Sequence, residues 1–280
     1  MTHRIRLFTV EDLPFGLHLS RQAGWNQTEN DWRRFLALQP DGGALAECDG
    51  RPAGTVFVIA FGHVAWIAMM LVEASRRGQG IGRALMEQAL LTAESFGARS
   101  IRLDATPLGQ QLYETLGFRS DFHLTRYGGK LHKAIAAQPS EMFVDDVPPH
   151  AQAAVPLDAR CSGADRRRLI DALLTETPGW GVTRDGVLQG FCAHRPGSHA
   201  VYIGPAVADG ESGAAVLQAA FRHFAGETAI IDIPDNHMAA RELAVSHGLS
   251  AQRPLLRMTR GATVDDCPQM LWASSGGEKG

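Results

Sequence analysis

One stretch of the sequence decides the fold: Leu71-Val72-Glu73-Ala74-Ser75-Arg76-Arg77-Gly78-Gln79-Gly80-Ile81-Gly82-Arg83-Ala84-Leu85. An uninterrupted apolar run at 64–72 leads into it and is typical of a buried strand. Beyond the glycines, apolar residues recur at four-residue steps at Ile81, Leu85 and Ala89, which predicts a helix. The stretch therefore predicts a strand, a glycine-rich turn and a helix in succession.

The glycine-rich turn has the chemistry of an anion site. Glycines let backbone N–H groups approach a phosphate with no Cβ in the way. The first turn of the following helix adds unpaired donors and a favourable dipole. Arg76, Arg77 and Arg83 add positive charge. The turn therefore predicts a pyrophosphate-binding site.

Two known phosphate-binding loops do not fit this turn. A P-loop requires Lys and then Ser or Thr after its last glycine, whereas Arg83 and Ala84 follow Gly82. A dinucleotide-binding loop requires G-x-G-x-x-G, whereas Gly78, Gly80 and Gly82 alternate. The pattern that fits is R-x-x-G-x-G, and an ordinary glycine-rich turn from strand to helix is the alternative.

The residues from Arg77 to Gly82 resemble the coenzyme A pyrophosphate loop of the GNAT N-acetyltransferase superfamily. The resemblance implies that acetyl-CoA is the co-substrate and that no metal takes part. It also implies a set of coenzyme-binding residues around the loop: Leu71, Val72, Arg77, Gly78, Gln79, Gly80, Ile81, Gly82, Arg83, Thr106 and Tyr113.

A second motif, Leu112-Tyr113-Glu114-Thr115-Leu116-Gly117-Phe118, is similar to the family pattern L-Y-x-x-x-G-F. The resemblance implies that Tyr113 lies near the coenzyme sulfur and protonates the departing thiolate, a step that benefits from a nearby proton donor. The alternative is a half-buried helix tyrosine with a satisfied hydroxyl. The chain departs from the family at Thr106-Pro107, where many members carry an asparagine.

Composition narrows the class of protein. The chain has 280 residues, 45% of them hydrophobic, with a net charge of −3 and a pI of about 6.4. It shows no basic stripe for nucleic acid, and its longest apolar run, 64–72, is too short to span a bilayer. Four scattered cysteines and an N-terminus without a signal peptide predict a reduced, cytoplasmic protein. Its oligomeric state is left open between a monomer and a homodimer.

The order of predicted elements matches the GNAT fold, an α/β fold with a mixed, mostly antiparallel sheet whose fourth and fifth strands splay apart. The predicted strands are at 5–9, 44–47, 53–61, 64–72, 101–103 and 122–127, and the helices at 11–24, 29–38, 82–96 and 110–116. The plan then repeats: Gly82 and Gly117 are 35 residues apart, and so are Gly213 and Gly248, at an offset of 131.

The repeat predicts two tandem GNAT-like domains, at 1–133 and 134–262, joined by a linker at 134–138. A C-terminal tail at 263–280 follows, with an added edge strand at 269–273 and frayed residues from 274 on. The offset sets Ala208, Asp209, Glu211 and Ala244 against Arg77, Gly78, Gly80 and Tyr113. Acids without a paired arginine repel a pyrophosphate, so the second domain is expected to be degenerate: structural, or a wall of the acceptor site.

The proposed chemistry is direct attack of an amine on the thioester carbonyl, with a backbone N–H near Leu71 or Val72 polarising that carbonyl. Many relatives carry an acid in the fourth strand, where this chain has Ala68 and Met69. The remaining candidates for the general base are Asp104, which is the first choice, Glu73 and His63, or a chain of water molecules.

The segment between the first two helices is the predicted acceptor site. Trp25, Asn26 and Glu29 suit a small amine through cation–π and carboxylate contacts. Trp25 and the nearby Trp32 fit equally well as core anchors. The sequence thus predicts an acetyl-CoA-dependent N-acetyltransferase acting on a primary amine of a small molecule or peptide. The alternative is a non-catalytic acyl-CoA-binding sensor.

Overall fold

A computed structural model describes residues 3–132, 145–147 and 151–277, which form two compact units. The first contains the described residues up to Leu103, together with Leu112–Arg119 and Thr259–Thr263. The second contains Asp104–Gln111, Ser120–Met258 and the described residues from Val264 on. The linker predicted at 134–138 and the tail residues 278–280 lie outside the described residues.

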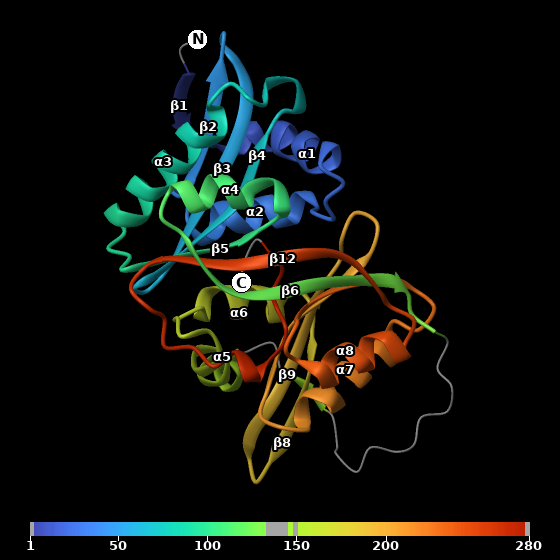
Figure 1. The fold of residues 1–280 in the computed structure, drawn as a ribbon. Coiled ribbons are helices and arrows are strands. Elements are labelled where there is room, and N and C mark those ends of the chain that lie inside the picture. The colour runs from blue at the N-terminus through green and yellow to red at the C-terminus, as the bar shows by residue number, and fades with distance from the viewer. Residues whose placement is uncertain (1–2, 133–144, 148–150, 278–280) are drawn as a thin grey trace. The chain divides into compact units, whose positions relative to one another are not determined.

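The first unit is built on a sheet in the order β1-β2-β3-β4-β5, antiparallel except for the parallel pair β4–β5. Figure 1 shows α3 on one side of these strands and α1 on the other. The elements are β1 (His3–Leu7), α1 (Leu13–Gln22), α2 (Glu29–Leu38), β2 (Gly43–Cys48), β3 (Arg51–Phe61), β4 (Val64–Val72), α3 (Ile81–Ser95), β5 (Ser100–Ala105) and α4 (Pro107–Thr115).

Aromatic rings form the centre of the core beneath α1 and α2. Phe8 stacks on Trp32 with ring centroids 5.5 Å apart, and Phe57 packs edge-on against both rings. A Cβ on Gly16 of α1 would come within 2.9 Å of the Trp32 indole, so only glycine lets the helix approach this closely. Trp32 is fully buried, and its Nε1 donates to Ser20 Oγ at 3.1 Å. Trp32 is therefore a core anchor and not a residue of the acceptor site.

The second unit has the sheet order β12-β6-β11-β10-β9-β8-β7, with β13 against β10 (Figure 1). The elements are β6 (Arg119–Lys130), β7 (Asp145–Val147), α5 (Ala154–Ser162), α6 (Arg167–Glu176), β8 (Gly179–Arg184), β9 (Val187–Arg195), β10 (Val201–Ala208), α7 (Ser212–His223), β11 (Thr228–Pro234), α8 (Met238–Ser246), β12 (Ser250–Gly261) and β13 (Leu271–Ala273). The predicted α/β class is confirmed, since each unit has parallel and antiparallel strand pairs flanked by helices.

The chain does not complete one unit before starting the other. The sequence predicts the strand at 122–127 as the last of the first domain, whereas β6 pairs antiparallel with β11 of the second unit. Arg126 of β6 donates twice to Asp232 of β11, both times at 2.7 Å, and both side chains are buried. Conversely, Thr259 of β12 belongs to the first unit, where its hydroxyl accepts from Arg102 Nε at 3.0 Å.

The tail is more ordered than the sequence predicts. The predicted edge strand exists as β13, but it pairs with β10, which also pairs with β9 and β11. Ser274 and Ser275 are buried, at 0% and 1% exposed, so the expectation of fraying is wrong for residues 274–277. Ser274 N–H donates to Asp232 O at 2.9 Å, which anchors the segment to β11.

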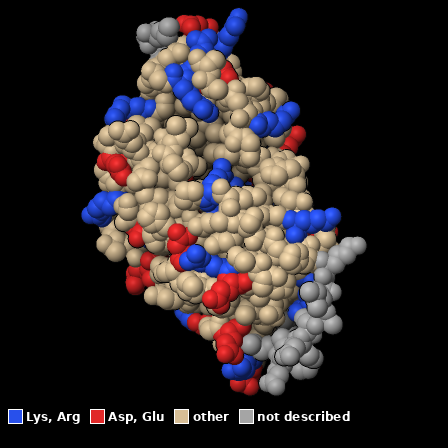
Figure 2. All heavy atoms as spheres, turned by 45° about the vertical axis from the view of Figure 1, so that its right-hand side comes forward, with Lys and Arg blue, Asp and Glu red and all other residues tan. Residues whose placement is uncertain are grey.

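In the part of the chain that the structure describes, no helix is long and apolar enough to cross a membrane. Figure 2 shows Lys and Arg side chains interspersed with Asp and Glu side chains on the face that it presents.

Candidate functional site

The turn between β4 and α3 has left-handed backbone at two of its glycines, as the sequence predicts. Gly78 and Gly80 have φ values of 74° and 81°, in the left-handed region that favours glycine. Gly80 is the N-cap of α3, and the first helical bond runs from Ala84 N–H to Gly80 O at 3.1 Å. The N–H groups of the first turn have no acceptor within the helix, so they are available to an anion.

Three arginines surround this turn, and each has a protein partner. Arg76 pairs with Asp49 at 3.3 Å, and Arg77 Nε donates to Val72 O at 3.3 Å. Arg83 Nη2 donates to Thr115 Oγ1 of α4 at 2.9 Å. Arg77 and Arg83 are exposed and Arg76 is half-buried, so their positive charges are accessible to an anion that approaches the turn from solvent.

Gly82 lies where α3 meets β4 and α4. A Cβ at this position would lie 3.3 Å from Met70 Cε and 3.7 Å from Leu112 Cδ2. The absence of a side chain therefore lets the start of the helix sit close to the strand. This places the free N–H groups of α3 beside the last residues of β4, Leu71 and Val72.

Toward its end, strand β4 is no longer paired with β5, as the family fold predicts. Its parallel pairing with β5 covers only Val64↔Ser100, Ala65↔Ile101 and Trp66↔Arg102, although β4 continues to Val72. Beyond Trp66 the two strands splay apart, and main-chain groups on that side of β4 are left available. Such groups could bind an extended ligand or a carbonyl oxygen.

Tyr113 projects from the last turns of α4, with its ring centroid 6.1 Å from that of Phe118. The side chain is half-buried, and burial raises its pKa to about 12. Its hydroxyl therefore stays protonated at neutral pH. Within the described ranges the hydroxyl has no hydrogen-bond partner from the protein.

None of the three predicted bases has the surroundings of a general base. Both oxygens of Asp104 accept from Arg257 at 2.9 Å, inside the second unit, and the carboxylate is 0% exposed. Glu73 accepts from Gln22 Nε2 and Ser75 Oγ, which lower its pKa. His63 lies in the exposed turn before β4, at the opposite end of this nine-residue strand from Val72 and the glycine-rich turn. A base needs a free lone pair and a pKa near the working pH, so the structure disfavours Asp104 in that role.

The remaining predicted residues differ in their surroundings. Trp25 is half-buried and Asn26 is 2% exposed, so this segment is part of the packed structure. Glu29 is exposed and pairs with Arg33 one helical turn away at 2.6 Å. Thr106, in the second unit, immediately precedes α4, and its carbonyl accepts from Gly109 N–H at 2.9 Å.

Two glutamines of the first unit, Gln22 and Gln27, have surroundings that the sequence does not predict. Gln22 links α1 to the start of the turn, since its Oε1 accepts from Ala74 N–H at 2.9 Å while its Nε2 donates to Glu73. Gln27 is 6% exposed, and its Oε1 has no partner within the described part of the chain. No sequence signal marks either residue, because both roles depend on contacts made only in the folded unit.

The corresponding turn of the second unit is shorter. Eight residues, 73–80, separate β4 from α3, whereas three, 209–211, separate β10 from α7. The offset of 131 holds for the pairs Ile81 and Ser212, Pro107 and Met238, and Arg119 and Ser250, but Val72 and Ala208 are 136 apart. The predicted match of Arg77 with Ala208 is therefore wrong, because Ala208 ends the strand.

The predicted charge repulsion at this turn also needs correction. Asp209 accepts from Arg160 Nη2 at 2.7 and 2.9 Å, so it does have a paired arginine. The loss of the loop has two other physical causes, one of which is the short turn itself. Three residues leave too little chain for a loop like that at 73–80.

The second cause is the C-terminal segment. β10 and β11 pair only at Val201↔Ala229 and Tyr202↔Ile230, so they too splay apart, and β13 pairs with β10 beyond that point. Trp272 of β13 covers the start of α7: a Cβ on Gly213 would come within 2.0 Å of its indole. The chain itself thus fills the gap that stays open in the first unit.

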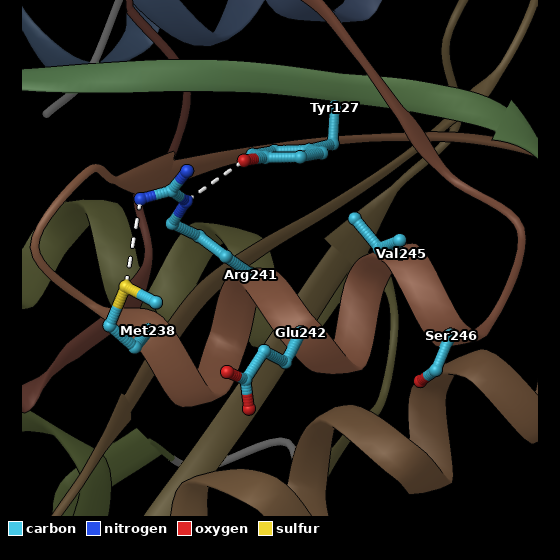
Figure 3. A pocket seen from close by; sticks show the side chains of 6 residues that line it. All are labelled: Tyr127, Met238, Arg241, Glu242, Val245 and Ser246. Carbon is cyan, nitrogen blue, oxygen red and sulfur yellow. Dashed lines mark hydrogen bonds between the residues drawn. The ribbon is translucent and has the colours of Figure 1, made fainter.

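A pocket of about 340 Å³ lies on α8 and β6 of the second unit (Figure 3). Its walls are partly apolar, because they include the side chains of Met238 and Val245, which are 57% and 56% exposed. Arg241 is held there by Tyr127, whose hydroxyl accepts from Nε at 3.0 Å, and by Asp235 O at 2.7 Å. All of its lining residues belong to the second unit.

No group of three or more His, Cys, Asp or Glu side chains that could hold a metal ion occurs among residues 3–132, 145–147 and 151–277.

Two family models match the chain, each described as an acetyltransferase (GNAT) domain. One covers residues 40–120 and the other residues 154–273. No curated protein matches.

Solved structures share the fold over nearly the whole chain. A structure from Pyrococcus horikoshii is 23% identical with a TM-score of 0.85, and the match covers 99% of this chain and 96% of that one. A tandem GNAT protein from the clavulanic acid biosynthesis pathway is 15% identical (TM-score 0.67; 94% and 99% covered). A GCN5-related N-acetyltransferase from Sphaerobacter thermophilus is 13% identical (TM-score 0.62; 95% and 98% covered).

Proposed function

Because the chain belongs to the GNAT acetyltransferase family and carries two such domains, we propose that its first domain transfers an acetyl group from acetyl-CoA to a primary amine of a small molecule or peptide. The observation that carries the proposal is the turn at 73–80. Its left-handed Gly78 and Gly80 open the N-terminus of α3 beside the unpaired end of β4. An anion and an extended arm can therefore bind side by side.

The proposed coenzyme site uses backbone groups for the pyrophosphate. The N–H groups from Gln79 to Gly82 face the phosphates, and Arg77 and Arg83 add charge at the rim. The pantetheine arm follows the open side of β4 to Val72. Thr106, just before α4, is the family's counterpart position in this set.

The proposed reaction is a direct attack within a ternary complex. The amine nitrogen forms a bond to the thioester carbon while the carbon–sulfur bond breaks. The Val72 N–H stabilises the negative charge that develops on the carbonyl oxygen. Tyr113 gives its proton to the leaving thiolate, and the amine loses its proton to water, since Asp104 and Glu73 are both engaged.

We assign the acceptor site to Trp25 and Asn26, which lie between α1 and α2. The half-buried indole of Trp25 suits a cationic or apolar acceptor. Asn26 is only 2% exposed, so its place in this set is carried by the sequence alone. Glu29 contributes less to this site than the sequence predicts, because Arg33 already neutralises its charge at the surface.

The second domain, on this proposal, binds no coenzyme. Its turn is short, and β13 and Trp272 occupy the positions that the first unit leaves open. Ala244 stands in α8 where Tyr113 stands in α4, since both helices keep the offset of 131. The second domain therefore lacks both the loop and the proton donor.

The function is tested by thiol release from acetyl-CoA with a panel of primary amines. We expect release above the rate of hydrolysis with at least one amine, and an acetylated product of the expected mass. Tight binding of acetyl-CoA with no release for any amine would instead support the non-catalytic acyl-CoA sensor. Absence of both binding and release would reject the two functions together.

A further inference from the structure

Strand β4 carries an irregularity shortly before its end. Its register with β3 is Phe57↔Ala68 before this point and Thr55↔Leu71 after it, so β4 has one residue more than β3 between the two pairs. Met69, within this segment, has a φ of 50°, which a non-glycine residue rarely adopts. This is a β-bulge with methionine in the left-handed position that glycine usually takes. Strained backbone of this kind clusters at functional sites.

The bulge determines which N–H groups of β4 face its open side. Glu73 N–H donates to Ala53 O of β3 at 2.9 Å, so the peptide groups of Val72, one residue earlier, point away from β3. The Val72 carbonyl also points away from β3, because it accepts a hydrogen bond from Arg77 Nε. Without the extra residue, the strand would slip by one position and Val72 would turn toward β3.

Thr55 of β3 is the side chain that holds the bulge. Its Oγ1 donates to Met69 O at 2.9 Å, and the two residues are 0% and 1% exposed. A buried carbonyl without a donor is costly, so this hydroxyl stabilises the one backbone conformation in which Met69 is left-handed. Valine has nearly the same shape but cannot donate this hydrogen bond.

We propose that Thr55 is a positioning residue for acetyl transfer: its hydroxyl holds the bulge at Met69 and thereby aims the Val72 N–H at the thioester carbonyl. This inference rests on the proposed function and goes beyond it, since Thr55 touches neither substrate. Thr55 acts through Met69 and Val72, so it should affect the transition state more than the binding of the coenzyme, whose phosphates are held at the turn.

The test compares Thr55→Val with Thr55→Ser, using acetyl-CoA and the most active amine of the panel. We expect Thr55→Val to lower kcat about tenfold, less than the loss of an oxyanion donor outright, because the N–H is misaimed rather than deleted. The KM for acetyl-CoA should stay within about twofold, since chemistry and not binding is affected. Thr55→Ser retains the hydroxyl and should retain most of kcat.

Val58→Ala is the matched control, because Val58 is buried in the same strand away from the bulge. It should lower stability without lowering kcat. An unchanged kcat in Thr55→Val, or equal losses in Thr55→Val, Thr55→Ser and Val58→Ala, would overturn the proposal. If Thr55→Val does not fold, Thr55→Ala removes the same hydroxyl, and the same outcomes apply. Inactivity of the wild-type protein would reject the proposed function instead, so the two failures are distinguishable.

Discussion

Replacing Tyr113 with phenylalanine is expected to lower kcat about a hundredfold or more, the usual contribution of a general acid. Phenylalanine keeps the ring that packs near Phe118 and removes only the hydroxyl. Burial raises the pKa of Tyr113 to about 12, so in the wild-type protein the proton is present at every pH used for an assay. Loss of activity from deprotonation of this group is expected only as the pH approaches 12.

The measurement is steady-state kcat with the most active amine, together with the calorimetric affinity for acetyl-CoA. The affinity should not change, because the hydroxyl acts on a leaving group that exists only during the reaction. Tyr127→Phe is the matched control, since it removes a tyrosine hydroxyl from the second unit, where Arg241 donates to it. A near-normal kcat in Tyr113→Phe would show that Tyr113 is not the acid.

A valine at Gly80 is expected to raise the Kd for acetyl-CoA at least tenfold, or about 1.4 kcal/mol. Gly80 has a φ of 81°, and a Cβ there would meet no atom within 4 Å, so the obstacle is backbone conformation rather than space. A β-branched residue shifts the backbone out of the left-handed region, which turns the N–H groups at the start of α3 away from the phosphates.

Gly97→Val is the control for backbone strain. Gly97 follows the other end of α3, with a φ of 77° and likewise no atom within 4 Å of an added Cβ. Both variants should lose similar stability, but only Gly80→Val should lose affinity. An unchanged calorimetric Kd in folded Gly80→Val would mean that the turn does not hold the coenzyme.

Local patterns in the sequence predict much of the first unit. The apolar run at 64–72 is β4, the segment 29–38 is α2, and Asp49-Gly50 forms the turn between β2 and β3 with φ values of 53° and 71°. These features depend on residues close together in the chain, such as the glycines that permit a left-handed turn. The same holds for Gly78 and Gly80, which is why the left-handed turn between β4 and α3 could be predicted from the sequence.

Features that depend on distant pairing could not be predicted in this way. The pairing of β6 with β11 rests on contacts such as Arg126 with Asp232, more than a hundred residues apart. The bulge at Met69 depends on a hydroxyl from the neighbouring strand. Local propensity carries no information on either contact, because both are made only when the sheet assembles.

Two expectations about the chemistry changed for the same reason. Asp104 reads as a free carboxylate in the sequence, and only the fold brings the Arg257 guanidinium onto both of its oxygens. The sequence predicts an edge strand at 269–273 but not its partner, and only the fold pairs β13 with β10 and packs Trp272 on Gly213. In both cases the partner comes from a segment far away in the chain: Arg257 for Asp104, and β10 for β13.

The most direct test of the account is a calorimetric titration of the intact protein with acetyl-CoA. The first unit has the long glycine turn and the open end of β4, whereas β13 closes the corresponding gap in the second unit. We therefore expect a stoichiometry close to one coenzyme per chain. A stoichiometry close to two would contradict the degeneracy of the second domain, and no binding at all would contradict the coenzyme site assigned to the turn at 73–80.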